Sequence, residues 1–251
     1  MKAMILAAGL GTRLRPLTDD RPKALVEIAG RTLLEITLSR LRAFGVREVI
    51  INVHHRADMI VEYLKKNDNF GMGIEVSREE ILLDTGGGLK KAAYFFLEDP
   101  SEKPFILHNV DVISTIDLEK MVRSHSASQA LATLAVQDRK ASRYLLFDQK
   151  LQLCGRRGDR DSKPELVRSS KSESEKLQAL AFSGIHVISP RFLAMMIEEG
   201  LFSIISTYLR LAGNNETIVG FQADEYYWRD LGKPENVKQA ARDLEQKVLL
   251  Q

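Results

Sequence analysis

The chain contains a single cysteine, Cys154, among its 251 residues, so no disulfide can form within it. Its 36 Lys and Arg residues and 34 Asp and Glu residues leave a formal net charge of +2. A balance so close to zero gives no field of one sign that would attract nucleic acid or an anionic membrane. No stretch approaches the roughly 18–20 apolar residues that a membrane helix needs. We therefore expect a soluble, cytoplasmic protein without nucleic-acid or membrane partners.

The composition is otherwise that of an ordinary globular protein, with 44% hydrophobic residues. In the first half, short apolar runs at Lys2–Ala7, Glu48–Val53 and Pro104–Asn109 predict strands. Between these runs, Leu33–Phe44 and Ala57–Lys66 have apolar residues at helical spacing. Mostly apolar strands that alternate with helices predict an α/β fold with a parallel sheet covered on both faces.

The second half of the chain contains shorter strands joined by polar turns. The charged, serine-rich stretch 155–176 has little apolar periodicity and predicts a mobile surface loop or an excursion from the sheet. Thr217–Gln222 and Glu225–Trp228 predict a hairpin. In the first half of the chain, Leu89–Phe96 predicts a helix directly after three glycines. No repeat and no shift in composition indicates a boundary, so we interpret residues 1–251 as one domain.

The strongest chemical signal is the run Leu6–Leu25, LAAGLGTRLRPLTDDRPKAL, at the end of the first predicted strand. Gly9 and Gly11 lack a Cβ, so the backbone N–H groups of this turn can approach phosphate oxygens. Arg13 and Lys23 add full positive charge. The alternative is a glycine-containing turn followed by solvated basic residues. The spacing fits neither the dinucleotide-binding fingerprint nor the Walker loop.

Two aspartates and a glycine run lie in contexts that favour ligand binding. Asp111 follows an apolar strand, and α/β sheets bind ligands at the carboxyl ends of their strands. Asp230 precedes Gly232, and a turn or cap role is the alternative for either aspartate. If the fold brings them together, their carboxylates present hard oxygen ligands to Mg²⁺. Gly86–Gly88 indicate either a flexible turn or close backbone access to a base or ribose.

The Leu6–Leu25 run resembles the signature of the sugar-1-phosphate nucleotidyltransferases, L-A-A-G-x-G-S/T-R-x-x-P-x-T followed by P-K. Later segments that also resemble this family are LDTGGGL at 83–89, NVD at 109–111, FSGI at 182–185 and WRDLGKP at 228–234. Together with SRYLLFD at 142–148, they make the chain most similar to the group of N-acetylmuramate 1-phosphate uridylyltransferases and mannose-1-phosphate guanylyltransferases. The chain departs from this group at Arg156, where tryptophan is expected, and it has no recognisable E-K-P element.

The resemblance implies a Rossmann-like fold of the nucleotide-diphospho-sugar transferase type, with a predominantly parallel, mixed central sheet flanked by helices. It implies Mg²⁺ as cofactor, held by Asp111 and Asp230, and the 155–176 loop on the sugar side of the site. Arg13, Lys23 and Asp111 would be catalytic, and Lys23, Asn109 and Gly184 would bind the sugar phosphate. The nucleotide-binding residues implied in this way are Leu6, Ala7, Ala8, Gly9, Gly11, Thr12, Arg13, Asp84, Thr85, Gly86 and Gly87.

The activity implied by the resemblance is attack of a sugar 1-phosphate oxygen on the α-phosphorus of a nucleoside triphosphate, with release of pyrophosphate. Our hypothesis for the substrates is UTP with N-acetylmuramate 1-phosphate or another hexosamine-type 1-phosphate. GTP with mannose 1-phosphate is the alternative within the family. Two alternatives come from other classes: a regulatory homologue that binds nucleotide without turnover, and a cytidylyltransferase that acts on an alcohol phosphate.

Overall fold

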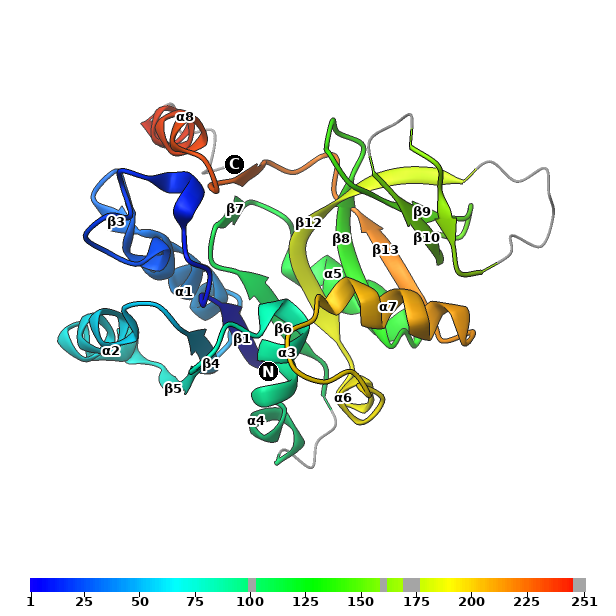
Figure 1. Cartoon of the computed structure of the whole chain (residues 1–251), viewed down its shortest axis with the longest axis horizontal. Helices are drawn as coiled ribbons and strands as arrows, with labels where there is room; N and C mark the ends of the chain where they lie inside the picture. The colour runs from blue at the N-terminus through cyan, green and yellow to red at the C-terminus, as the bar shows by residue number, and fades with distance from the viewer. Residues whose placement is uncertain (99–102, 159–161, 169–176, 246–251) are drawn as a thin grey trace.

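A mixed sheet of ten strands forms the centre of the molecule (Figure 1). The structure is a computed structural model and describes residues 1–98, 103–158, 162–168 and 177–245. Along its main path, the sheet contains β11 (Glu165–Leu166), β10 (Leu153–Arg157), β9 (Tyr144–Phe147), β12 (Gln178–Ile188), β6 (Phe105–Asn109), β1 (Lys2–Leu6), β4 (Glu48–Val53) and β5 (Gly73–Arg78). β8 (Ala132–Gln137) pairs with β12 and with β13 (Ile218–Gln222).

Most strands of this sheet run in one direction. β5, β4, β1 and β6 are parallel neighbours, and β13 is parallel to β8. β12 pairs antiparallel with β6, β8 and β9, and β10 pairs antiparallel with β9 and β11. The expected mixed and mostly parallel sheet is therefore confirmed, with β12 and β10 running against the other described strands.

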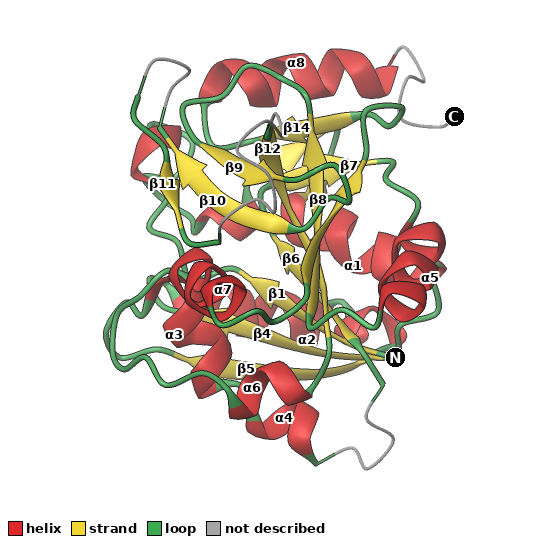
Figure 2. Ribbon diagram, turned by 90° about the vertical axis from the view of Figure 1, so that its right-hand side faces the viewer, coloured by secondary structure: helices red, strands yellow, loops and turns green. Residues whose placement is uncertain are grey.

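Helices cover both faces of the sheet, as Figure 2 shows for α3 and α7 on one side and α1 and α5 on the other. Ala3 and Ile5 of β1 belong to one buried cluster and Met4 to a second, because successive side chains of a strand point to opposite faces. Among the described residues, no helix is long and apolar enough to cross a membrane. The helices are α1 (Leu33–Ala43), α2 (Ala57–Lys66), α3 (Asp84–Lys91), α4 (Tyr94–Leu97), α5 (Leu118–Ser128), α6 (Arg191–Ala194), α7 (Ile204–Gly213) and α8 (Pro234–Glu245).

Short elements outside the central sheet complete the described fold. Two of them are small antiparallel sheets, and the others are single turns of 3₁₀-helix. They are β2 (Glu27–Ile28) with β3 (Arg31–Thr32), β7 (Val112–Ser114) with β14 (Trp228–Asp230), and η1 (Thr12–Leu14), η2 (Lys23–Leu25) and η3 (Asp68–Gly71).

α1 forms where the sequence predicts it because both of its ends carry local signals. The Thr32 hydroxyl caps the helix by accepting a hydrogen bond from the Glu35 N–H at 3.1 Å. Gly45 follows the helix with a φ of 101°, and a glycine with positive φ commonly ends a helix. β4 and α2 also have the predicted bounds, Glu48–Val53 and Ala57–Lys66.

Several expectations for the rest of the chain are wrong. Thr217–Gln222 and Glu225–Trp228 do not form a hairpin, because β13 pairs with β8 and β14 pairs with β7. The helix expected over Leu89–Phe96 is two helices, and the first of them, α3, includes the three preceding glycines. The stretch expected as a loop contains the end of β10 and its partner β11, while residues 159–161 and 169–176 lie outside the described residues.

Gly87 occupies a position in α3 with little room for a methyl group. A Cβ there would lie 2.4 Å from the backbone oxygen of Gly200 and 2.9 Å from the Cβ of Leu83. Because a backbone oxygen cannot rotate away, we expect Gly87→Ala to lower the free energy of unfolding by about 1–3 kcal/mol. Urea unfolding followed by circular dichroism measures this loss. Gly9→Ala is the matched control, since Gly9 has no neighbour within 4 Å of such a Cβ, and an equal loss in both variants would contradict the prediction.

Candidate active site

The glycine loop after β1 packs closely against Lys23. Gly11 has a φ of 67°, a left-handed conformation that favours glycine. A Cβ at Gly11 would lie 3.0 Å from Cγ2 of Thr18 and 3.2 Å from Cβ of Lys23. The Thr18 hydroxyl also donates a hydrogen bond to the Gly11 carbonyl at 2.9 Å. The loop therefore needs glycine at position 11 to lie against the lysine.

Lys23 and Asp111 form an ion pair at the carboxyl edge of the sheet. The Lys23 ammonium donates to Oδ2 of Asp111, and the two side chains are only 13% and 15% exposed. Asp111 follows β6, and Leu6 and Asn109 are register partners at the ends of β1 and β6. The parallel pairing of these strands thus brings the glycine loop and Asp111 to the same edge, where α/β folds bind their ligands.

Asp230 reaches this edge from far along the chain. β14 pairs antiparallel with β7, Asp230 lies opposite Val112, and the Leu231 N–H donates to the Asp111 carbonyl at 2.8 Å. Arg13 is also close, because a Cβ at Gly232 would lie 2.7 Å from Oδ1 of Asp230 and 3.0 Å from Nη2 of Arg13. The fold therefore brings together Arg13, Asp111 and Asp230, which the sequence singles out from three distant motifs.

A buried chain of polar contacts links the glycine loop to α3. The side-chain oxygen of Asn52 accepts the Ala7 N–H at 2.8 Å, and its amide donates to Glu79 Oε1 at 2.7 Å. Glu79 Oε2 accepts the Leu83 N–H at 3.0 Å, just before α3 begins. Asn52 and Glu79 are not among the residues predicted from the sequence. A signal for the first was present, since Asn52 is the polar residue within the otherwise apolar end of β4.

The residues predicted to bind the base lie at the N-terminal end of α3. Asp84 begins this helix at φ 59°, and the Thr85 hydroxyl accepts the Ile204 N–H at 3.0 Å. The N–H groups of Gly86 and Gly87 lie 3.0 and 3.3 Å from the Phe202 carbonyl. These glycines therefore pack against the segment before α7 and already have a hydrogen-bond acceptor there. Their contact with a nucleotide stays a prediction.

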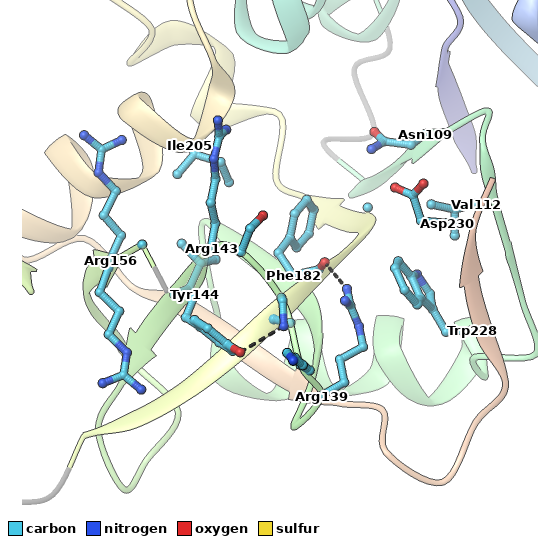
Figure 3. Close-up of a pocket in the computed structure, with 18 of the residues that line it drawn as sticks. Asn109, Val112, Arg139, Arg143, Tyr144, Arg156, Phe182, Ile205, Trp228 and Asp230 are labelled. Carbon is cyan, nitrogen blue, oxygen red and sulfur yellow. Dashed lines mark hydrogen bonds between the residues drawn. The ribbon is translucent and has the colours of Figure 1, made fainter. Parts of the chain in front are cut away.

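A cavity of about 1010 Å³ opens beside Arg13 and Asp230 (Figure 3). Four of the predicted site residues line it, whereas Lys23, Asp111 and the glycines of α3 lie outside its lining. Figure 3 shows Asn109, Asp230 and Trp228 at one end and Arg143 and Arg156 at the other. The four predicted residues in the lining are Arg13, Asn109, Gly184 and Asp230.

Asn109 offers an acceptor for a ligand in this cavity. Its Oδ1 is buried, and no donor reaches it among the residues that the structure describes. Gly184 has a φ of 74° and packs against it, because a Cβ there would lie 2.9 Å from the Asn109 amide nitrogen. Buried polar atoms are almost always hydrogen-bonded, so a hydrogen-bond donor of a bound ligand would satisfy this oxygen.

Arg139 and Trp228 form a rigid part of the cavity wall that the sequence analysis did not predict. The Arg139 guanidinium lies 3.6 Å from the Trp228 ring centroid and donates to the Phe182 carbonyl at 2.7 Å. The Trp228 indole N–H donates to the Ser183 carbonyl at 2.7 Å. Burial lowers the pKa of Arg139, while the negative charge of Asp230 acts in the opposite direction. The guanidinium therefore adds positive charge near Asp230.

His108, the residue before Asn109, is part of the core and does not line the cavity. It is 1% exposed, and its Nδ1 lies 2.8 Å from the Asn109 carbonyl. Burial lowers the pKa of His108 to about 3, so the ring is neutral at physiological pH.

The nucleotidyl transferase family model matches residues 2–247. This chain belongs to that family. The chain is 33% identical over 240 residues to the N-acetylmuramate alpha-1-phosphate uridylyltransferase of Caulobacter vibrioides, a match that covers 93% of this chain and 92% of that protein. A crystal structure of a UDP-glucose pyrophosphorylase complexed with UDP-glucose has the same fold, with a TM-score of 0.77 at 16% identity over 98% of both chains.

The chain is also 31% identical over 238 residues to a mannose-1-phosphate guanyltransferase of Candida albicans. That match covers 94% of this chain and 62% of the fungal protein, so this nucleotidyltransferase spans less than two thirds of its relative. The resemblance inferred from the Leu6–Leu25 motif is confirmed, and the chain is a nucleotidyltransferase.

The two carboxylates of this nucleotidyltransferase fit a Mg²⁺ ion that is shared with a substrate phosphate. Within the described ranges, no three His, Cys, Asp or Glu side chains gather as a metal site. Asp111 and Asp230 supply two carboxylates, and the Lys23 ammonium lies against one of them. Mg²⁺ in phosphoryl-transfer sites is held by one or two carboxylates and takes its other ligands from water and phosphates. We therefore expect these residues to hold the ion together with nucleotide rather than alone.

Asp111→Asn and Asp230→Asn test this arrangement. Each variant removes a charged ligand, so we expect Mn²⁺ binding in the presence of nucleoside triphosphate to weaken by roughly tenfold or more. Electron paramagnetic resonance of free Mn²⁺ measures the affinity, and circular dichroism verifies that the variants fold. Asp138→Asn, which removes an exposed carboxylate outside the lining of the cavity, is the control and should bind as the wild type does. Equal affinity in all three variants would contradict the assignment.

Proposed function

We propose that the enzyme transfers the uridylyl group of UTP to N-acetylmuramate 1-phosphate, which gives UDP-N-acetylmuramate and pyrophosphate. The observation that carries the reaction class is the meeting of Arg13, Asp111 and Asp230 beside a strongly basic cavity. Nine Lys and Arg residues but only three Asp and Glu residues line this cavity. Two polyanionic substrates repel each other, and an excess of fixed positive charge offsets that repulsion.

The chemistry needs alignment and charge neutralisation more than covalent help from the protein. Asp111 and Asp230 would hold Mg²⁺, which when bound neutralises phosphate charge beside the α-phosphorus. Arg13 lies next to Asp230 and would bind the β- and γ-phosphates that leave as pyrophosphate. Lys23 would turn from Asp111 to bridge the α-phosphate and the sugar phosphate, because its ammonium already lies at that carboxylate.

The nucleotide would lie between the glycine loop and the N-terminal end of α3. Asn52 and Glu79 hold these two segments together, which supports a shared role in binding one ligand. The backbone of Leu6–Ala8 and the loop with Gly9, Gly11 and Thr12 would hold the ribose and triphosphate. Asp84–Gly87 would contact the base.

The choice of UTP and N-acetylmuramate 1-phosphate rests on the match to the Caulobacter uridylyltransferase, which covers almost the full length of both chains. GTP with mannose 1-phosphate is the second candidate, because the match to the Candida guanyltransferase covers 94% of this chain. The fold is common to both activities. Contacts of the base with Asp84–Gly87 and of the sugar with the cavity would therefore decide which substrates the enzyme uses.

Pyrophosphate release with UTP, GTP and CTP, each combined with N-acetylmuramate 1-phosphate and mannose 1-phosphate, tests the proposal. We expect kcat/KM for UTP to exceed that for GTP by about tenfold or more, since a polar group left unpaired in the base slot costs roughly 1–3 kcal/mol. A preference for GTP with mannose 1-phosphate would overturn the proposed substrate specificity, while the reaction class would still hold. No pyrophosphate from any pair would contradict the reaction class and favour a homologue that only binds nucleotide.

Two arginines of the glycine loop provide a matched control for this assay. Arg13→Ala should lower kcat/KM by roughly a hundredfold or more, because it removes a charged donor from the departing phosphates. The Arg15 side chain is 71% exposed and pairs with Asp19 at 3.5 Å, so Arg15→Ala should leave the rate unchanged. An unchanged rate in the Arg13 variant would show that this arginine does not act on the triphosphate.

A further inference from the structure

Basic side chains other than those beside Asp230 also line the cavity. We call Arg143, Arg156, Arg157 and Lys163 the outer basic wall, and all four line the cavity. Figure 3 shows Arg143 and Arg156 on the far side of Phe182 from Asn109 and Asp230. Phosphates that react beside Asp230 would therefore lie away from Arg143 and Arg156.

Among the residues that the structure describes, ion pairs neutralise only part of the outer basic wall. Arg156 donates to Glu165 at 2.7 Å, across the pairing of β10 with β11. Neither Arg143 nor Arg157 has a carboxylate partner among the described residues. An anion that enters a cavity lined by an excess of cations is bound favourably.

Arg157 is held in place more firmly than a solvated surface arginine. It lies in β10 directly opposite Tyr144 of β9, and its guanidinium carbon is 5.6 Å from the centroid of that ring. Its Nε is buried and has no hydrogen-bond partner among the described residues. A buried donor without an acceptor is unusual in proteins and is satisfied when a ligand supplies the acceptor.

We infer that Arg143 and Arg157 determine specificity by binding a carboxylate that the sugar carries on a ring carbon away from the anomeric phosphate. The inference rests on the proposed function and deepens it, since N-acetylmuramate differs from N-acetylglucosamine by a lactyl ether that ends in a carboxylate. Arginine binds carboxylates through paired, charge-assisted hydrogen bonds. A neutral sugar leaves both guanidinium groups unpaired, so the outer basic wall selects for the acidic sugar and against the neutral one.

The test compares two sugar phosphates that differ only in the lactyl group. With UTP, the wild-type enzyme should use N-acetylmuramate 1-phosphate with a kcat/KM at least about tenfold above that for N-acetylglucosamine 1-phosphate. Arg143→Ala and Arg157→Ala should each lower the ratio of kcat/KM for the acidic sugar to that for the neutral sugar by about tenfold or more. For Arg143→Lys, kcat/KM with the acidic sugar should fall between the values of the wild type and the alanine variant. Lysine keeps the positive charge but lacks the paired N–H donors of the guanidinium group.

Arg123→Ala is the matched control, because Arg123 is exposed on α5, pairs with Glu119 and lies outside the cavity. It should leave both values unchanged. An equal loss for both sugars in the Arg143 and Arg157 variants, or no preference for the acidic sugar in the wild type, would overturn the inference while uridylyl transfer stands. If neither sugar phosphate is turned over with UTP, the proposed function fails, and the inference fails with it.

Discussion

The antiparallel pairing of β7 with β14 is the constraint on which the site depends. Asp111 lies between β6 and β7, and Asp230 ends β14, so the hydrogen bond from the Leu231 N–H to the Asp111 carbonyl brings two distant segments into contact. Without this pairing, Asp230 would not lie beside Asp111, and the proposed metal site would lose one of its two carboxylates. In the proposed reaction, the small sheet would therefore contribute to the chemistry as well as to packing.

The ion pair of Lys23 with Asp111 balances the charges of these two side chains. Lys23 neutralises Asp111 within the protein, so the carboxylate does not face water unpaired. In the proposed reaction, the same ammonium would exchange the carboxylate for phosphate oxygens, and a divalent cation held by Asp111 would offset the loss of the ion pair. The pair would thus prepare the site to bind an anion and a cation together.

Features that depend on local sequence signals could be predicted from the sequence, whereas features that depend on contacts between distant segments could not. Thr32 and Gly45 specify the ends of α1 by themselves, and the Leu6–Leu25 motif identified Arg13 and Lys23. The pairing of β13 with β8 could not be predicted, because parallel partners are chosen by the whole sheet. The clash with Gly200 that fixes Gly87 as glycine involves residues more than a hundred positions apart. Arg143 and Arg157 come from separate segments of the sequence, and the fold places both in the lining of one cavity.

The central claim is that the sugar phosphate attacks the α-phosphorus of the triphosphate directly. The most direct test uses a UTP analogue with sulfur on the α-phosphorus in one defined configuration, and determines by ³¹P nuclear magnetic resonance the configuration of the sulfur-substituted nucleotide sugar that forms. One direct in-line displacement inverts the configuration at the α-phosphorus, so the account predicts inversion. Retention, which two successive displacements through a uridylylated side chain would give, would contradict the account.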